Sequence, residues 1–168
     1  MDNHRNSLFA SEIASNKRDP ELQFNGKDID RMLDTIESVK TDFLEEKTWS
    51  IIHQETWLSI RSLGIDDSIV HKHCNKLAAY RYVDEIHQLH RGKFARWIRL
   101  DSPTSISTGG IVAEIKFTNA GIHITCRLYN GRYVQYAFDE CLTYQKLTQE
   151  EQTILTLYTE LEHQITEP

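Results

Sequence analysis

Apolar side chains recur at three- and four-residue steps through the first half of the chain, which predicts helices. One stretch begins at Asp28, a second covers residues 45–63 before Gly64, and a third covers residues 66–90. A glycine directly after a helical pattern is a common helix end. The apolar positions are Ile29, Met32, Leu33, Ile36, Val39 and Phe43, then Trp49, Ile52 and Leu58, then Ile69, Val70, Leu77, Tyr80, Val83, Ile86 and Leu89. Because the connecting loops are short, we expect three antiparallel helices over residues 28–91.

The apolar period then changes from 3.6 to 2, which predicts β-strands. The expected strands cover residues 93–100, 109–117, 122–128 and 132–138. Asn130 and Gly131, between the last two strands, form the strongest short hairpin signal. We expect an antiparallel meander of four or five strands, either covered by the helices or closed into a small β-barrel.

Thr148, followed three residues later by Glu151, matches a capping box and predicts a last helix over residues 148–165. Its apolar positions are Ile154, Leu155, Tyr158, Leu161 and Ile165. The predicted fold class is therefore α+β. The expected domains are a flexible N-terminal tail over 1–27 and a single domain over 28–168, which contains a helical half over 28–91, the sheet over 92–146 and the helix over 148–165.

The composition is that of an ordinary globular protein, with 39% hydrophobic, 10% aromatic and 26% charged residues. No apolar run approaches the roughly 20 residues needed to span a bilayer, and residues 1–18 lack the apolar stretch of a secretory signal. The three cysteines, Cys74, Cys126 and Cys141, are too scattered for a disulfide framework. These features predict a cytoplasmic protein with no membrane association.

The net charge of −6 is unevenly distributed along the chain. Residues 71–146 carry a net charge of +5, so the remainder carries −11. A basic middle between acidic flanks is compatible with a surface that binds a polyanion. It is equally compatible with attraction between the two parts of the fold.

Basic side chains accompany aromatic ones along the predicted sheet, which is a pattern of proteins that bind single-stranded nucleic acid. On a regular strand, however, Arg96 and Arg99 lie on opposite faces, and the aromatic side chains are equally expected to fill the core. The candidate nucleic-acid-binding residues are Arg91, Lys93, Arg96, Arg99, Arg127 and Arg132, with Trp97, Tyr129, Tyr133 and Tyr136 nearby.

Glu114 and Lys116 lie two residues apart on a predicted strand, and Asp101 ends the strand before it. This order resembles the PD-(D/E)XK nucleases, in which two carboxylates hold a divalent metal and the lysine orients or activates water. A solvated strand face predicts the same Glu-x-Lys pair. A hairpin follows this strand instead of the helix of that fold, and the Pro-Asp element is absent.

Other catalytic or metal-binding patterns are weak. His71 and His73 are two residues apart on a predicted helix and point to different sides, whereas His87 and His90 share a face. No Cys-x-x-Cys pair supports a zinc site there, and no Gly-rich phosphate loop is present. We therefore expect no metal, no cofactor and no catalytic residue outside the nuclease alternative.

Several short segments between residues 80 and 155 are similar to a group of uncharacterised proteins of large DNA viruses of eukaryotes. This resemblance implies a virus-encoded protein that acts in the host cytoplasm or in the virus particle, and it implies no catalytic residue. The segments are residues 80–87 (YRYVDEIH), 91–98 (RGKFARWI), 109–112 (GGIV), 139–141 (DEC), 145–147 (QKL) and 150–151 (EE).

The sequence thus favours a non-enzymatic interaction module that binds a protein partner through the sheet edge or the helical face. The first alternative is a nucleic-acid-binding protein with a basic sheet face. The second is a metal-dependent nuclease that uses Asp101, Glu114 and Lys116.

Overall fold

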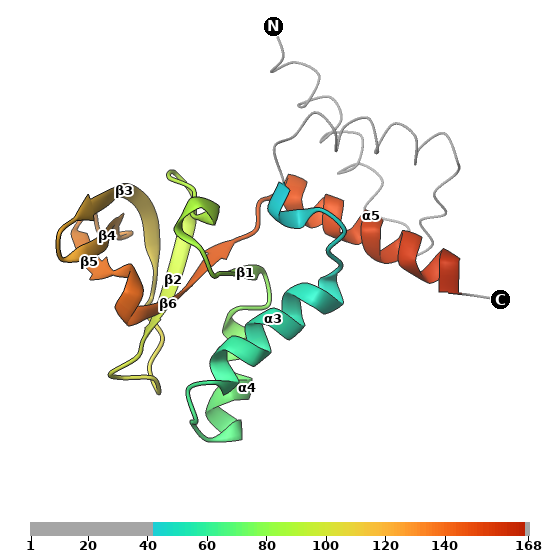
Figure 1. The fold of residues 1–168 in the computed structure, drawn as a ribbon, viewed down its shortest axis with the longest axis horizontal. Helices are drawn as coiled ribbons and strands as arrows, with labels where there is room; N and C mark the ends of the chain where they lie inside the picture. Colours follow the sequence, from blue (N-terminus) through green and yellow to red (C-terminus); the bar gives the residue numbers. More distant parts are fainter. Residues whose placement is uncertain (1–41, 167–168) are drawn as a thin grey trace, which may run out of the picture. The chain divides into compact units, whose positions relative to one another are not determined.

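A computed structural model describes residues 42–166 of the chain, which form an α+β structure as expected (Figure 1). The tail expected over 1–27 and nearly all of the helix expected over 28–43 lie outside the described residues. The chain divides into two compact units, one of which covers residues 46–148. The described elements of the other unit are the 3₁₀ turn η1 (Asp42–Leu44) and the helix α5 (Gln149–Thr166).

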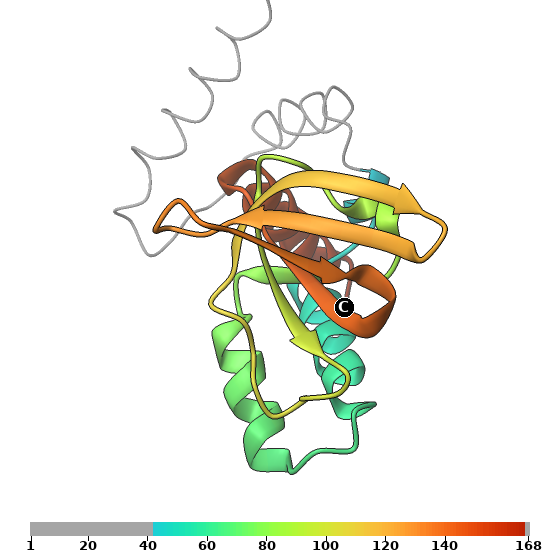
Figure 2. The same ribbon diagram turned by 90° about the vertical axis from the view of Figure 1, so that its left-hand side faces the viewer.

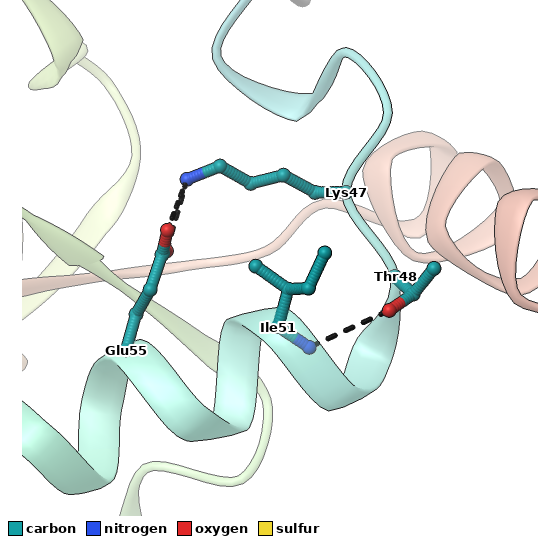
Figure 3. Close-up of polar contacts among 4 residues, drawn as sticks. All are labelled: Lys47, Thr48, Ile51 and Glu55. Atoms are coloured by element: carbon teal, nitrogen blue, oxygen red, sulfur yellow. Dashed lines mark hydrogen bonds and ion pairs between the residues drawn. The ribbon is translucent and has the colours of Figure 1, made fainter.

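Helix α3 (Trp49–Arg61) confirms the helix expected over 45–63, but Leu58, which was expected on its buried side, is 52% exposed. Thr48 caps its start, where the Thr48 hydroxyl accepts a hydrogen bond of 3.4 Å from the Ile51 amide (Figure 3). The Lys47 ammonium group lies 2.8 Å from the Glu55 carboxylate on the second turn (Figure 3). Gly64 follows with a φ of +66°, which favours glycine and ends the helical path.

The helix expected over 66–90 is wrong beyond its first ten residues. Helix α4 (Asp67–Lys76) ends early, and the chain continues as strand β1 (Tyr80–Val83) and the 3₁₀ turn η2 (Ile86–Gln88). Tyr80, Val83, Ile86 and Leu89 are spaced like a helical stripe, although the segment over 80–83 pairs with a strand. Aromatic and β-branched residues favour such pairing over a helix.

The sheet has six strands, all antiparallel to their neighbours, in the order β1-β6-β2-β3-β4-β5. The four strands expected from the sequence are confirmed as β2 (Phe94–Arg99), β3 (Gly110–Thr118), β4 (Gly121–Arg127) and β5 (Tyr133–Ala137). Two further strands exceed the expected four or five: β1 and β6 (Cys141–Lys146), the latter preceded by the 3₁₀ turn η3 (Phe138–Glu140). Strand β6 lies between β1 and β2, in the middle of one half of the sheet.

The two faces of the sheet bury different clusters. On the outer face, helices α3 and α4 pack over β1, β6 and β2, where Ile60 and Val70 meet Tyr80, Ile98 and Tyr144. Figure 1 shows both helices on this side of β1, β2 and β6, whereas β3, β4 and β5 extend beyond them. The inner face carries the second cluster, which contains Val83, Leu89, Ala95, Val112, Ile124, Cys126 and Tyr136.

The sheet curls around this inner cluster without closing. Strand β5 pairs with β4 and with no second strand among residues 42–166, so the structure is an open sheet and the barrel alternative is wrong. The curl still brings side chains of distant strands together. The Tyr136 hydroxyl lies 3.2 Å from the Thr143 hydroxyl of β6. The curvature is visible where β3, β4 and β5 bend across the other strands (Figure 2).

A buried polar contact fixes the inner face of β1 and β6. Gln145 is fully buried, and its side chain bonds both the backbone N–H of His90, at 2.9 Å, and the backbone C=O of His90, at 2.7 Å. The same side-chain oxygen accepts a bond of 3.1 Å from buried Arg81, which also donates to the carbonyl of Gln88. The segment after β1 is therefore held against β6.

Helix α5 confirms the helix expected over 148–165. Ile154 and Leu155 are buried as expected, together with Leu157 and the charged Glu151, whereas Ile165 is 86% exposed. No helix within residues 42–166 is both long and apolar enough to cross a membrane.

Candidate binding surface on the outer sheet face

The outer face of β3, β4 and β5 lies beyond the helices that cover the rest of this face. Ile111, Arg127 and Tyr133 are direct cross-strand neighbours on these strands. Directly opposed side chains of an antiparallel pair lie about 5 Å apart at Cβ. Ile111 is 45% exposed and Tyr133 63% exposed, and Arg127 is also exposed. A cationic side chain therefore stands between an aliphatic and an aromatic one on an open surface.

Four other outer residues of these strands have partners of their own. Glu114 and Lys116 form an ion pair of 3.4 Å along β3. The Gln135 amide donates a bond of 3.4 Å to the Thr125 hydroxyl. The side chain of Arg127, in contrast, forms no hydrogen bond or ion pair with any residue of the described range. Its charge is thus available to a binding partner.

The turn after β4, next to this surface, adds a second exposed tyrosine and a second exposed arginine. The Asn130 side chain accepts a bond of 3.0 Å from the Arg132 amide, and Gly131 has a φ of +82°. The predicted Asn-Gly hairpin is therefore confirmed. Tyr129 is 95% exposed, and Arg132 is exposed with no ion-pair partner in residues 42–166. We call Ile111, Arg127, Tyr129, Arg132 and Tyr133 the outer patch.

The position of Ile111 in this patch differs from the sequence-based expectation. On a regular strand over residues 109–117, Ile111 would share the core face with Ile115 and Phe117, whereas Phe117 is in fact 73% exposed. A register shift between Val112 and Glu114 breaks the alternation, because Val112 pairs with Cys126 and Glu114 with Thr125. Ile111 is exposed on the outer face as a result, and the sequence carries no signal for this shift.

The six basic residues predicted to bind nucleic acid are only partly brought together. Arg127 and Arg132 lie on one hairpin. Arg96 and Arg99 alternate on β2, opposite Tyr144 and Cys141 of β6. They therefore lie on opposite faces, as expected. Arg91 and Lys93 are in the segment that leads into β2.

Two of these arginines are engaged within the fold. The Arg96 guanidinium lies over the Tyr80 ring, 5.7 Å from its centroid, and its Nε atom is buried. Arg99 forms two hydrogen bonds with the Asp101 carboxylate, at 2.9 and 2.7 Å. These bonds hold the pKa of Asp101 below its usual value. Trp97, which is partly buried, and Tyr136, which is buried, stack on each other in the inner cluster.

The residues of the nuclease alternative do not meet. Glu114 and Lys116 share the outer face, as expected, but Asp101 follows the far end of β2. Phe94 at the start of β2 pairs with Ile111, and Glu114 lies beyond Ile111 in the opposite direction. Asp101 is seven residues beyond Phe94 and Glu114 is three beyond Ile111, with one residue in the register shift, so at about 3.3 Å per residue the two acidic residues are roughly 30 Å apart along the strands. They cannot share one ion, because each carboxylate oxygen would have to lie within about 2.5 Å of it.

The histidines serve local contacts instead of a common site. His73 is buried, and its Nε2 lies 3.0 Å from the Pro103 carbonyl in the β2–β3 loop. His87 pairs with Glu85 at 3.1 Å. No group of three or more His, Cys, Asp or Glu side chains in the described part of the chain is arranged to hold a metal ion.

The thiols of Cys126 and Cys141 in the sheet have raised pKa values, not the lowered ones of reactive cysteines. Burial raises the pKa of the Cys126 thiol from 9.0 to about 12. Burial is also the main cause that raises the pKa of Cys141, to about 11. A nucleophilic cysteine requires a lowered pKa, so neither residue has the electrostatic environment of a catalytic thiol.

Comparison of the chain with protein-family models, with curated proteins and with solved structures found no match.

Proposed function

We propose that the chain is a non-enzymatic interaction module that binds a protein partner through the outer patch. The observation that carries this proposal is the row Ile111, Arg127 and Tyr133. In it, an arginine without an intramolecular partner stands between two exposed apolar side chains. Tyrosine and arginine are enriched at protein interfaces and among the residues that dominate binding energy.

The charges of the patch indicate the chemistry of the partner surface. Arg127 and Arg132 carry the two positive charges, and the patch residues themselves include no acid. The complementary surface has a carboxylate that pairs with Arg127, flanked by apolar side chains that cover Tyr133 and Ile111. A bidentate arginine–carboxylate pair supplies direction as well as energy. The resemblance to viral proteins suggests that this partner belongs to the infected cell or to the virus particle.

Nucleic-acid binding is the second candidate function, and the two tyrosines and two arginines of the β4–β5 hairpin favour it. Bases stack on exposed aromatic rings and phosphates pair with arginine. The protein partner is favoured over it because Arg96 and Arg99 are engaged elsewhere and lie on opposite faces. The basic residues therefore do not form a continuous track for a phosphate backbone.

The test compares the full chain with an Arg127→Ala/Tyr133→Ala variant as affinity baits in an extract of the source cells. We expect the wild-type chain to form a stoichiometric complex with an identified protein, and the double variant to lose it. The matched control is Leu58→Ala on α3, because Leu58 is also exposed, at 52%, but lies outside the patch. A complex that survives the double variant and is lost in the control would contradict the proposed surface.

A parallel measurement separates the alternatives. Labelled single- and double-stranded nucleic acids are titrated with the purified chain at two salt concentrations, with and without magnesium. Binding that weakens steeply with salt and is lost in Arg127→Ala would favour the nucleic-acid function, because phosphate contacts release counterions. Magnesium-dependent cleavage that disappears in Glu114→Ala would overturn the non-enzymatic proposal.

A further inference from the structure

Strand β5 is an edge strand with an unused row of backbone hydrogen-bonding groups. The Leu128 amide bonds the Arg132 carbonyl at 2.7 Å where the β4–β5 ladder begins. Hydrogen-bonded pairs alternate along an antiparallel ladder, so Val134 and Tyr136 point their backbone groups toward β4. The N–H and C=O groups of Tyr133, Gln135 and Ala137 therefore point to the free edge. Among residues 42–166, no other strand pairs with this edge.

The sequence of this strand lacks the features by which proteins block edge pairing. Charged residues, proline and bulges are the usual means of protection. Residues 133–137 (YVQYA) contain no charge and no proline, and their register with β4 is unbroken. Tyr133 and Gln135 are exposed. The edge is thus open and chemically suited to accept another strand.

We propose that two copies of this chain associate by antiparallel pairing of their β5 strands around a two-fold axis at Gln135. An axis at this residue places Gln135 opposite its own copy and Tyr133 opposite the copy of Ala137. These are the residues whose backbone groups point to the edge, so the pairing forms about six new hydrogen bonds across the two-fold axis. An axis at Val134 or Tyr136 would pair only two of these three residues of each strand, so it would form about four hydrogen bonds within residues 133–137.

The side chains also agree with this register. Val134 of one copy lies opposite Tyr136 of the other, and both belong to the inner, apolar face. The outer position at the axis is the uncharged Gln135. No like charges are therefore opposed at the two-fold axis. The inner, apolar face of one sheet is continuous with the inner face of the other, and the same holds for the two outer faces.

Charge complementarity at both ends of the paired strands identifies a second copy as the occupant. In the same register, Arg132 precedes Tyr133 and is brought toward the η3 turn of the other copy, which carries Asp139 and Glu140. All three side chains are exposed, and none forms an ion pair within the described residues. The two-fold symmetry repeats the contact at the other end of the interface.

The proposal does not rest on the proposed function, because Ile111, Arg127 and Tyr133 lie on the outer face and not at the edge, although Arg132 takes part in both. The Gln135→Lys variant and the Arg127→Ala/Tyr133→Ala variant therefore test the two proposals separately. It is tested by sedimentation equilibrium of the full chain over a wide concentration range. We expect a monomer–dimer equilibrium that Gln135→Lys shifts at least tenfold toward monomer, since the variant places two ammonium groups at the axis. The matched control is Thr125→Lys, one strand inward on the same face, which is expected to leave the equilibrium nearly unchanged.

Exchanging the charges at the two ends of the interface tests the proposed register specifically. Arg132→Glu alone and Asp139→Lys/Glu140→Lys alone are each expected to be mainly monomeric, because like charges then meet at both ends. An equimolar mixture of the two variants is expected to recover dimer, because both end contacts become attractive. A chain that stays monomeric at every concentration, or a dimer that Gln135→Lys leaves intact, would overturn the proposal. Failure of the mixture to dimerise would overturn the proposed register.

Discussion

The indole ring of Trp97 on β2 stacks on the phenol ring of Tyr136 on β5, with ring centroids 4.4 Å apart and planes inclined by 15°. These strands are not neighbours, because β3 and β4 lie between them in the sheet. The contact exists only because the sheet curls. The Tyr136–Thr143 hydrogen bond likewise connects two strands that are not neighbours in the sheet, β5 and β6.

Removing the Tyr136 ring is therefore expected to loosen the curl. We expect Tyr136→Ala to lower the free energy of unfolding by about 3–5 kcal/mol, the usual cost of truncating a buried aromatic residue. Tyr136→Phe keeps the stacking and loses only the hydroxyl, at a cost of about 1 kcal/mol. Urea denaturation measures both values. Equal losses in the two variants would show that the hydrogen bond, not the ring contact, holds β5.

Gln145 is expected to be as important for stability as a large core residue, although it is polar. Gln145→Leu leaves the Arg81 guanidinium short of a partner and leaves both backbone groups of His90 without theirs. An unsatisfied buried polar group costs about 1–3 kcal/mol, and more when it is charged. We expect a loss of at least about 3 kcal/mol in urea denaturation. Gln54→Leu on α3 is the exposed control, and a similar loss there would contradict this account.

The same residue explains why part of the fold could not be predicted from the sequence. Strand β6 is covered on both faces, with Leu142 and Tyr144 on the helical side and Thr143 and Gln145 on the inner side. Two of its buried residues are polar, so the alternation of apolar and polar positions that marked β2 to β5 is absent. The sequence of β6 does not indicate that Gln145 contacts Arg81, which is distant in the sequence.

Local signals, in contrast, were sufficient where the structure depends on local geometry. Gly64 ends the α3 segment and Asn130-Gly131 closes the β4–β5 hairpin because both require a backbone with positive φ at a defined position. The candidate surface was predictable only in part. Arg127, Arg132 and their tyrosines stand out in the sequence, but the exposure of Ile111 depends on a register shift that follows from pairing with β4.

Two of the glycines with positive φ, Gly109 and Gly131, are expected to respond differently to alanine. A Cβ at Gly109 would lie 2.5 Å from the Phe94 ring and 2.6 Å from the Ala95 carbonyl oxygen, in addition to the strain of a φ of +86°. A Cβ at Gly131 meets no atom within 4 Å. We expect Gly131→Ala to cost about 1–2 kcal/mol from strain alone, and Gly109→Ala clearly more. Thermal denaturation of both variants checks the order.

The free energy of unfolding is expected to fall at alkaline pH. Burial raises the pKa of Cys126 to about 12 in the folded chain, whereas the unfolded thiol ionises near 9.0. Above pH 9 the unfolded chain therefore loses a proton that the folded chain keeps, which favours unfolding. The stability is full below pH 9 and is lost progressively up to about pH 12. Burial raises the pKa of Tyr136 and Tyr144 as well, and both shifts act in the same direction.

Urea denaturation at several values between pH 8 and 11 measures this loss. Cys126→Ala is expected to be less stable at every pH but to show a shallower decline above pH 9, because one contributing group is gone. A decline that is equally steep in the wild-type chain and in this variant would assign the effect to the tyrosines alone.

The position of β6 between β1 and β2 has a consequence for synthesis on the ribosome. Every hydrogen-bonded neighbour of β1 in the sheet is supplied by residues 141–146, far downstream of residues 80–83. Until that segment has left the ribosome, β1 and one side of β2 have open edges, and contacts between such distant segments form slowly. A nascent chain that stalls after the β4–β5 hairpin would thus expose the unpaired strand β1 and the open edge of β2, both of which can pair with other chains until translation delivers β6.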